Sequence, residues 1–319
     1  MKNENHTHKS EPRTLLEAVR HFSDPDTCHA YMVGIKWPDG KVTCPDCGGD
    51  HVGEIKSRRM FQCKAKGCRK QFSVKVGTIF EDSPLGPDKW LVAVWCIVCA
   101  KNGISSCELA RTIGVTQKSA WHMLHRIRLA MQTPTYRRIS GKVETDETHV
   151  GGLVKFKHKA DRDRIKAKFG PEGKNKTIVQ GVLERGGEVR AQVVKNNQSR
   201  HIQPGIRANV EPGSILYSDI GSWYRGLEAE YVLQQVNHAI EYVNGEIHTN
   251  SLENFWSLLK RSLRGTYVAV APWQLNRYLD EFCRRFNLRK LTDAQRFHAV
   301  MRYVVGRRLT YATLTGKTC

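Results

Sequence analysis

The sequence has no long hydrophobic run. Its most apolar stretch, Trp90–Ala100, is far too short to span a bilayer. Residues 1–13 contain no apolar segment of the kind that a signal peptide needs. Both absences argue against a membrane-embedded or secreted protein, and we expect a cytoplasmic one with no membrane partner.

Acidic residues are also few compared with basic ones. The 319 residues include 31 Asp and Glu against 51 Lys and Arg, a formal net charge of +20. Such an excess attracts polyanions, and nucleic acid is the first candidate, although charge describes association rather than activity. The chain is long enough to form two or three domains, each with its own core.

Most of the ten cysteines are scattered, which does not fit a disulfide scaffold. Four of them form two close pairs with fifteen residues between the pairs: Cys44, Cys47, Cys63 and Cys68. Glycines beside each pair allow the sulfurs to converge, so the spacing predicts a four-thiolate Zn²⁺ site in a zinc ribbon. The alternative is four reduced cysteines without metal. Basic residues surround the cluster, and the ribbon either contacts DNA phosphates or serves as a scaffold.

A second candidate DNA-binding element follows the cysteine cluster. A capped helix begins after Ser105, Gly114 makes a turn, and a longer helix begins near Gln117. This layout is typical of a helix-turn-helix, which would direct Thr116, Gln117, Lys118 and Ser119 at base edges. Arg126 on the longer helix favours DNA binding, and a helical hairpin with only a packing role is the alternative.

Beyond residue 137 the pattern indicates a mixed α/β domain. Strands are expected at Lys142–Glu147, Thr177–Leu183, Val189–Val194, Ser214–Asp219 and Tyr231–Val236. A basic loop, Lys155–Lys176, separates the first two strands, and a helix interrupted near Pro204 follows the third. Two of the strands carry an aspartate late in their run, Asp146 and Asp219.

The last strand leads to a helix within His248–Tyr267. Its apolar residues recur at steps of three and four, and Gly265 is expected to end it. Glu253 and Lys260 share one stripe of this helix, two turns apart, with Asn250 beside it. These two residues are seven positions apart, whereas the charge pairs that stabilise isolated helices are three or four positions apart. We therefore expect a partner outside the helix for these side chains.

The three acids predict a metal site. A carboxylate at the end of a core strand is costly to bury alone, and a shared cation would offset that cost for Asp146 and Asp219. Glu253, or Asn250, would complete the site. Oxygen ligands suit Mg²⁺ or Mn²⁺, and a pair of such ions supports phosphoryl transfer without a protein nucleophile. The alternative is three unrelated surface acids.

These motifs together resemble the DDE-type transposases of bacterial insertion sequences. The resemblance rests on three blocks: Thr145-Asp146-Glu147-Thr148-x-Val150-Gly151-Gly152, Ser218-Asp219, and His248-Thr249-Asn250-x-x-Glu253-x-x-Trp256-x-x-x-Lys260. More narrowly, the chain is similar to the group with an N-terminal zinc ribbon that is related to the Merlin elements. The resemblance covers about residues 37–287, and the third block is its most specific part.

The resemblance implies an RNase H-like catalytic domain that cuts and joins DNA with a divalent metal. Its substrates would be terminal inverted repeats and target DNA. It would act as a homo-oligomer on paired ends, and it would be found in the cytoplasm of a bacterial-type cell, associated with the nucleoid. Asp146 and Asp219 match the first two metal-binding acids of the family. Glu253 is favoured as the third ligand, with Asn250 as the alternative, and Lys260 would contact a terminal base or phosphate.

The expected fold class is therefore α/β, with an RNase H-like domain preceded by a zinc ribbon and a helix-turn-helix. The expected segments are an N-terminal helical segment (1–36), a zinc ribbon (37–82), a helix-turn-helix domain (83–136), a catalytic domain (137–270) and a C-terminal helical extension (271–319). The rival hypothesis is a DNA-binding regulator derived from a transposase, with an inactive catalytic domain.

Overall fold

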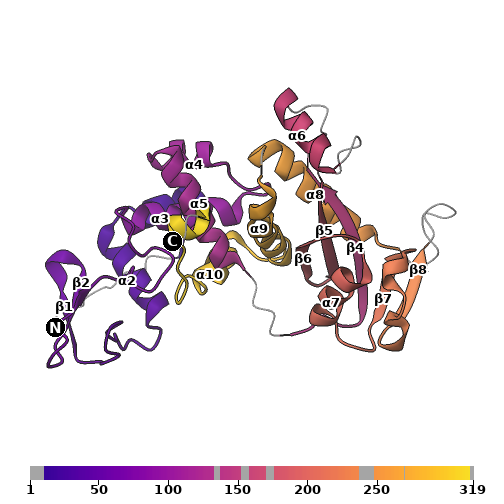
Figure 1. The fold of residues 1–319 in the computed structure, drawn as a ribbon. Coiled ribbons are helices and arrows are strands. Elements are labelled where there is room, and N and C mark those ends of the chain that lie inside the picture. Colours follow the sequence, from indigo (N-terminus) through magenta and orange to yellow (C-terminus); the bar gives the residue numbers. More distant parts are fainter. Residues whose placement is uncertain are drawn as a thin grey trace. The chain divides into compact units, whose positions relative to one another are not determined.

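A computed structural model describes residues 11–132, 137–151, 158–169, 176–236, 248–268 and 270–316. The chain forms two compact units (Figure 1): Met1–Gln132 with Lys290–Cys319, and Thr133–Arg289. Within the described ranges, no helix is both long and apolar enough to cross a membrane.

The first unit combines a small sheet with a group of helices. Its helices are α1 (Leu15–His21), α2 (Pro25–Lys36), α3 (Pro87–Cys99), α4 (Ser106–Ile113), α5 (Gln117–Met131), α10 (Asp293–Met301) and α11 (Tyr311–Thr315). Its antiparallel sheet contains β1 (Val52–Ile55), β2 (Met60–Cys63) and β3 (Gln71–Phe72) in that order. Strands β1 and β2 are joined by the short 3-10 helix Lys56–Arg58.

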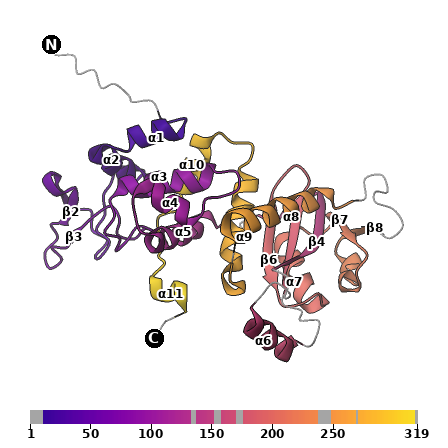
Figure 2. The same cartoon turned by 90° about the horizontal axis from the view of Figure 1, so that it is seen from above.

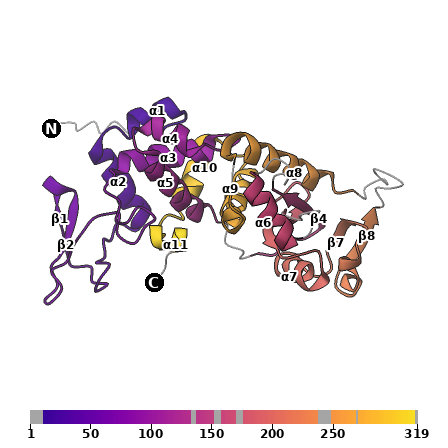
Figure 3. The same cartoon turned by 45° about the horizontal axis from the view of Figure 1, so that its top comes forward.

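The end of the chain returns to this first unit. Phe297 of α10 contacts Trp95 of α3, with ring centroids 5.1 Å apart, and both side chains are buried. Helix α11 lies beside α5, because Tyr311 meets Trp121 (Figure 3). The segment 271–319, expected as one C-terminal extension, is therefore divided between the two units.

The second unit is a five-stranded mixed sheet with helices on both faces. Its strands are β4 (Lys142–Val150), β5 (Thr177–Glu184), β6 (Val189–Val194), β7 (Ile215–Asp219) and β8 (Val232–Val236), in the order β6-β5-β4-β7-β8. Strand β4 pairs antiparallel with β5 and parallel with β7. Its helices are α6 (Lys159–Phe169), α7 (Ser199–Asn209), α8 (Asn250–Ser262) and α9 (Leu275–Asn287). Short 3-10 helices occur at Ser222–Tyr224, Leu227–Ala229 and Pro272–Gln274.

Two hydrophobic cores fix the layers of this unit. Alternate residues of a strand point to opposite faces, so Val179 and Leu183 of β5 pack against α8 and α9, whereas Val182 packs against α7. Figure 2 shows α7 and α8 on opposite sides of the sheet. The apolar stripe predicted for α8 is the part of this helix that enters the core, with Leu252, Phe255, Trp256 and Leu259 all buried.

Helix α9 also covers the outer edge of strand β6. Asn276 accepts a hydrogen bond from the Val193 amide, and Asn287 both accepts from the Val189 amide and donates to the Val189 carbonyl. Side chains of α9 therefore satisfy backbone groups that an edge strand otherwise leaves open to another chain.

Four local predictions for this unit were wrong. Strand β4, expected to end at Glu147, continues to Val150, so Asp146 lies within the strand and not near its end. Helix α7 runs through Pro204 without a break, because its neighbours Ile202, Gly205 and Ile206 are buried against the sheet. Part of the expected basic loop is helix α6, and residues 155–157 and 170–175 of that loop lie outside the described residues. Gly265 does not end the helix that follows Thr249, since a π-helical turn, Leu263–Tyr267, continues from α8.

Candidate active site

Asp146 and Asp219 lie side by side on one face of the sheet. Glu144 of β4 is in register with Tyr217 of the parallel neighbour β7, and each aspartate comes two residues later on its strand. A step of two residues returns a side chain to the same face, and neighbouring strands lie about 4.8 Å apart. The strand pairing thus brings together two acids that are far apart in the sequence.

The carboxylate of Asp146 has a defined environment. The Trp256 indole donates a 2.9 Å hydrogen bond to Oδ2, and the Glu147 amide donates a 2.7 Å bond to Oδ1. Burial, the negative charge of Asp219 and, more weakly, that of Glu253 raise the pKa of Asp146 to about 6. The negative charges of Asp219 and Glu253 therefore both act on Asp146, and a bound cation would favour the ionised form of Asp146.

Helix α8 carries the remaining predicted residues past these acids. Asn250 and Glu253 are exposed in its first turn, and Thr249 Oγ1 lies 3.5 Å from Asp219 Oδ1. Burial, the charge of Lys176 and, more weakly, that of Lys260, two turns further on along α8, lower the pKa of His149 near the end of β4. Glu253 and Lys260, the predicted acid and its basic partner, therefore both lie near β4, the first close to Asp146 and the second close to His149.

The residues fit a divalent cation chemically, because Asp146, Asp219 and Glu253 offer only oxygen ligands. Among the described residues, however, one group of three or more potential ligands has its ligand atoms within 4.8 Å of one another, and it consists of the four ribbon cysteines. Asp146, Asp219 and Glu253 do not converge to that degree in this structure.

Glu147, which follows Asp146 in the sequence, belongs to a different environment. Its side chain points to the opposite face of β4, where Tyr224 donates a 2.8 Å hydrogen bond to Oε1. Burial raises the pKa of Glu147 to about 7. Strand alternation therefore separates the two adjacent acids and leaves only Asp146 beside Asp219.

Gly181 of β5 allows α8 to approach Asp146. It is the cross-strand partner of Asp146, and a Cβ at this position would lie 2.6 Å from the Trp256 ring and 3.1 Å from Leu252. Both of those side chains are buried. A glycine is thus required for the Trp256 indole to lie over the β4–β5 pair and reach Asp146.

We expect Gly181→Ala to lower the free energy of unfolding of the second unit by about 1–3 kcal/mol, because the added methyl overpacks a buried ring. Denaturant unfolding measures this loss. Gly265→Ala is the matched control, since a Cβ there meets nothing within 4 Å. Equal stability of the two variants would contradict the close packing of Trp256 on β5.

Two functional-site residues were missed by the motifs, Glu144 and Arg185. The Glu144 side chain is fully buried, and its carboxylate accepts hydrogen bonds from Arg185 Nε at 2.8 Å and from the Leu252 amide at 2.9 Å. Arg185 also donates to the His248 carbonyl at 2.7 Å. An acid two residues before Asp146, on the same strand face, was the available sequence signal.

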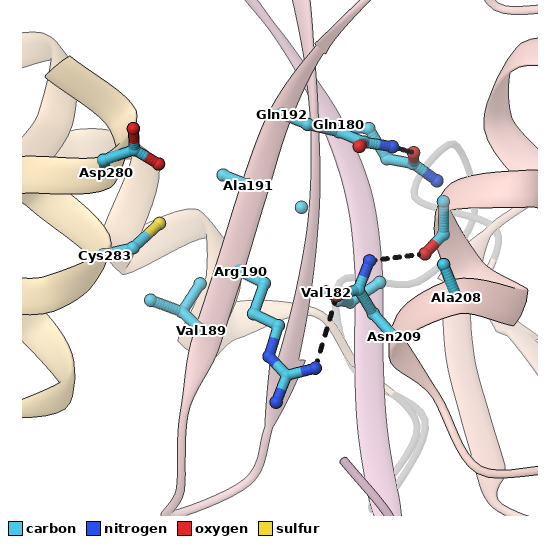
Figure 4. A pocket seen from close by; sticks show the side chains of 12 residues that line it. Gln180, Val182, Val189, Arg190, Ala191, Gln192, Ala208, Asn209, Asp280 and Cys283 are labelled. Atoms are coloured by element: carbon cyan, nitrogen blue, oxygen red, sulfur yellow. Dashed lines mark hydrogen bonds between the residues drawn. The ribbon is translucent and has the colours of Figure 1, made fainter. Parts of the chain in front are cut away.

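A pocket of about 330 Å³ lies elsewhere in the same unit, beside β5 and β6 (Figure 4). Gln192 donates to Gln180 at 3.1 Å on one of its walls, and Asn209 donates to the Gly205 carbonyl at 2.8 Å on another. Cys283 of α9 lines its opposite side. None of the predicted catalytic residues lines this pocket, so it is separate from the acid site.

The helix-turn-helix layout is present in the first unit. Gly114 ends α4 with φ +64°, and Thr116 caps α5 by accepting a hydrogen bond from the Ser119 amide. Gln117 and Lys118 are exposed at the start of α5, where Gln117 donates to Ser106 and Lys118 lies over the Tyr311 ring. The four residues predicted at base edges therefore share the first turn of α5.

Arg126, by contrast, is not on the surface of α5. Arg126 is 5% exposed, and its guanidinium donates to the carbonyls of Leu309 at 3.0 Å and Glu81 at 2.7 Å. The structure thus contradicts the expectation of DNA contact at Arg126. The side chain instead joins α5 to two distant segments of its own unit.

The four ribbon cysteines form a compact cluster. The sulfurs of Cys44 and Cys68 are 3.7 Å apart, and those of Cys47 and Cys63 are 3.6 Å apart. Four sulfurs around zinc with bonds of about 2.3 Å would be about 3.8 Å apart. A hydrogen bond from the Cys47 amide lowers the pKa of Cys44 to about 7, whereas burial and hydrogen bonds with the neighbouring thiols raise the pKa of Cys68. The cluster supports Zn²⁺ binding.

Comparison with known proteins identifies a transposase domain and a zinc-ribbon domain in this chain. Residues 138–287 match the ISXO2-like transposase domain, and residues 23–71 match the transposase zinc-ribbon domain. An uncharacterised transposase-like protein of Haemophilus influenzae is 33% identical over 96 residues, which are 30% of this chain and 77% of that protein. The chain belongs to the ISXO2-like transposase family.

A longer match supports this assignment. A protein of the transposable element ISH50 in Halobacterium salinarum, itself uncharacterised, is 28% identical over 268 residues, covering 81% of this chain and 88% of the relative. No solved structure matches the chain. The resemblance to zinc-ribbon DDE transposases is confirmed, and the sheet and helices of the second unit are consistent with an RNase H-like transposase domain.

Proposed function

We propose that this transposase-family protein binds the terminal inverted repeats of an insertion sequence and catalyses metal-dependent DNA cleavage and strand transfer. The observation that carries the proposal is the lateral alignment of Asp146 and Asp219 on neighbouring strands, with Glu253 on the helix that crosses them. Two aligned acids and a third nearby are the ligands that Mg²⁺ or Mn²⁺ chemistry on phosphates requires.

Asp146, Asp219 and Glu253 would hold the divalent ions, which activate a hydroxyl nucleophile and stabilise the leaving oxygen of the phosphodiester when bound. The hydrogen bond from Trp256 orients the Asp146 carboxylate, and the Glu147 amide supports its other oxygen. Lys260, whose charge acts on His149 as that of Lys176 does, would supply positive charge for a terminal phosphate.

Glu253 is the favoured third ligand, and Asn250 is the alternative. Both side chains are exposed in the first turn of α8, so either is accessible to a metal ion. The charge of Glu253 contributes to the raised pKa of Asp146, which supports its nearness to the acid pair. A carboxylate also binds a divalent cation more strongly than a neutral amide does.

DNA recognition is assigned to the first unit. Thr116, Gln117, Lys118 and Ser119 begin the second helix of the helix-turn-helix, the position from which such helices contact base edges. Exposed basic side chains surround the zinc ribbon and would contact phosphates: Arg58, Arg59, Lys64, Lys66, Arg69 and Lys70. We propose that a homo-oligomer of the chain brings two terminal repeats together.

A strand-transfer assay tests this function. Purified protein is incubated with the terminal DNA of its own element, a supercoiled target and Mg²⁺, and wild type is compared with Glu253→Gln and Asn250→Ala. We expect joined products from wild type and their loss in Glu253→Gln, with activity retained by Asn250→Ala.

Other outcomes of this assay have defined meanings. Loss of joining only in Asn250→Ala would assign the third ligand to Asn250. Specific binding of the ends by wild type without cutting or joining would overturn the enzyme and favour a DNA-binding regulator. Hydrolysis without joining would instead indicate a nuclease.

A further inference from the structure

Helix α8 has no cap of its own at the end that carries the predicted metal ligands. Thr249 is its N-cap residue, and its side chain makes no capping hydrogen bond. The first amides of a helix lack the carbonyl partner four residues earlier that later amides have. The Leu252 amide donates to the Thr249 carbonyl at 3.0 Å and also to Glu144 Oε2 at 2.9 Å, and Glu144 belongs to strand β4, 108 residues away in the sequence.

Glu144 is itself held in a single orientation. Its carboxylate is fully buried, with Oε1 2.8 Å from Arg185 Nε and 3.6 Å from His248 Nδ1. A buried carboxylate is stabilised only when its oxygens are paired, so each of these contacts offsets the cost of burying the charge. Its negative charge also lies at the positive end of the helix dipole of α8.

Arg185 links the strand to the chain that enters α8. It follows the end of β5, and one terminal nitrogen donates to the His248 carbonyl at 2.7 Å while Nε binds Glu144. The guanidinium lies over the Tyr217 ring of β7, with its carbon 4.0 Å from the ring centroid. A planar, two-sided donor of this kind cannot be replaced by lysine without losing one of the bonds.

The residues of this cluster form a layer directly below the acids. Glu144 and Tyr217 are cross-strand partners, and Asp146 and Asp219 lie two residues further along the same two strands. The layer of Glu144, Tyr217, Arg185 and His248 therefore joins three strands of the sheet to the residues immediately before Asn250. Any displacement of this layer would move the first turn of α8 relative to Asp146 and Asp219.

We propose that Glu144 and Arg185 are positioning residues that hold the first turn of α8 at the acid pair. They touch neither substrate nor metal, and they act through the placement of Asn250 and Glu253. This inference rests on the proposed function, because a placement of ligands matters only if the acids bind metal. Replacing residues that support the ligands of a metal site typically lowers metal affinity or activity by about 10–100-fold.

The test compares Glu144→Gln and Arg185→Lys with wild type by two measurements. Hydrogen exchange reports on the first turn of α8, and cleavage of terminal DNA is titrated with Mn²⁺. We expect exchange of residues 248–253 to become at least about tenfold faster while α9 is unchanged. We also expect the Mn²⁺ midpoint to rise about 10–100-fold, with DNA binding kept.

Glu230→Gln is the matched control. Arg207 Nε and Glu230 Oε1 form an ion pair at 2.8 Å, the same distance as in the Arg185–Glu144 pair, but it joins α7 to the segment before β8. We expect this variant to keep the wild-type exchange of α8 and the wild-type Mn²⁺ midpoint. Unchanged exchange of α9 in Glu144→Gln and Arg185→Lys separates a local effect on α8 from a general loss of stability, because the control pair is more exposed than the Glu144 pair.

The outcomes separate the two proposals. If wild type cleaves and the midpoints of Glu144→Gln and Arg185→Lys match that of Glu230→Gln, the positioning role is wrong. If wild type itself neither cleaves nor joins, the proposed function fails, and the exchange measurement still decides whether Glu144 holds α8. Should Glu144→Gln fail to fold, Arg185→Lys carries the test, because it keeps the charge and one hydrogen bond.

Discussion

Asp219→Ala is expected to abolish DNA cleavage and strand joining, by on the order of 10³-fold or more, while specific binding to the terminal repeats persists. Asp219 is the last residue of β7 and lies beside Asp146, so its loss removes one of two aligned ligands. The residues proposed to contact base edges, residues 116–119, belong to the other compact unit and are not altered. Cleavage rates and gel-shift affinities measure the two effects separately.

Glu211→Ala is the control for this prediction. Glu211 is an exposed acid of the same unit, located between α7 and β7 rather than beside Asp146. We expect wild-type cleavage and binding from it. If Asp219→Ala lost DNA binding but kept cleavage, the proposal that the first unit recognises DNA and the second unit cleaves it would be wrong.

Cys63→Ser is expected to remove zinc and unfold the ribbon. The Cys63 side chain is fully buried in the cysteine cluster, and a structural zinc contributes about 10–16 kcal/mol to the folding of small zinc domains. The three short strands of the ribbon bury too little surface to remain folded without that contribution. Metal analysis gives the zinc content, and limited proteolysis within residues 23–71 reports the unfolding.

Cys107→Ser serves as the comparison, because Cys107 is exposed on α4 and outside the cluster. We expect it to keep its zinc and its resistance to proteolysis. The same zinc content in both variants would argue that Cys63 is not a ligand.

Local patterns in the sequence predicted elements whose signal is itself local. The spacing of apolar residues identified α8 and the face that it buries, because a helix repeats every 3.6 residues regardless of its surroundings. Cysteine spacing indicated the ribbon cluster, because two close cysteine pairs, each in a tight turn, can bring their four sulfurs around one metal ion. Asp146 and Asp219 were identified because each was expected late on an apolar strand. Asp219 is the last residue of β7, whereas β4 continues beyond Asp146 to Val150.

Contacts between distant segments changed the interpretation of several residues. Arg126 is on a basic helix that suggested DNA, but its partners, Glu81 and Leu309, are 45 and 183 residues away in the sequence. Pro204 suggested a break, yet packing against the sheet keeps α7 continuous. Local propensity is a weak prior that buried contacts override.

The sequence by itself determined which residues are available for chemistry: four clustered cysteines, two aspartates on apolar strands, and a helix that carries Asn250, Glu253 and Lys260. Only the tertiary structure decided how they meet. The pairing of β4 with β7 set Asp146 beside Asp219, and the contacts of Glu144 with Arg185 and Leu252 set the position of α8. Strand register and buried ion pairs depend on segments far apart in the chain, and no local spacing encodes them.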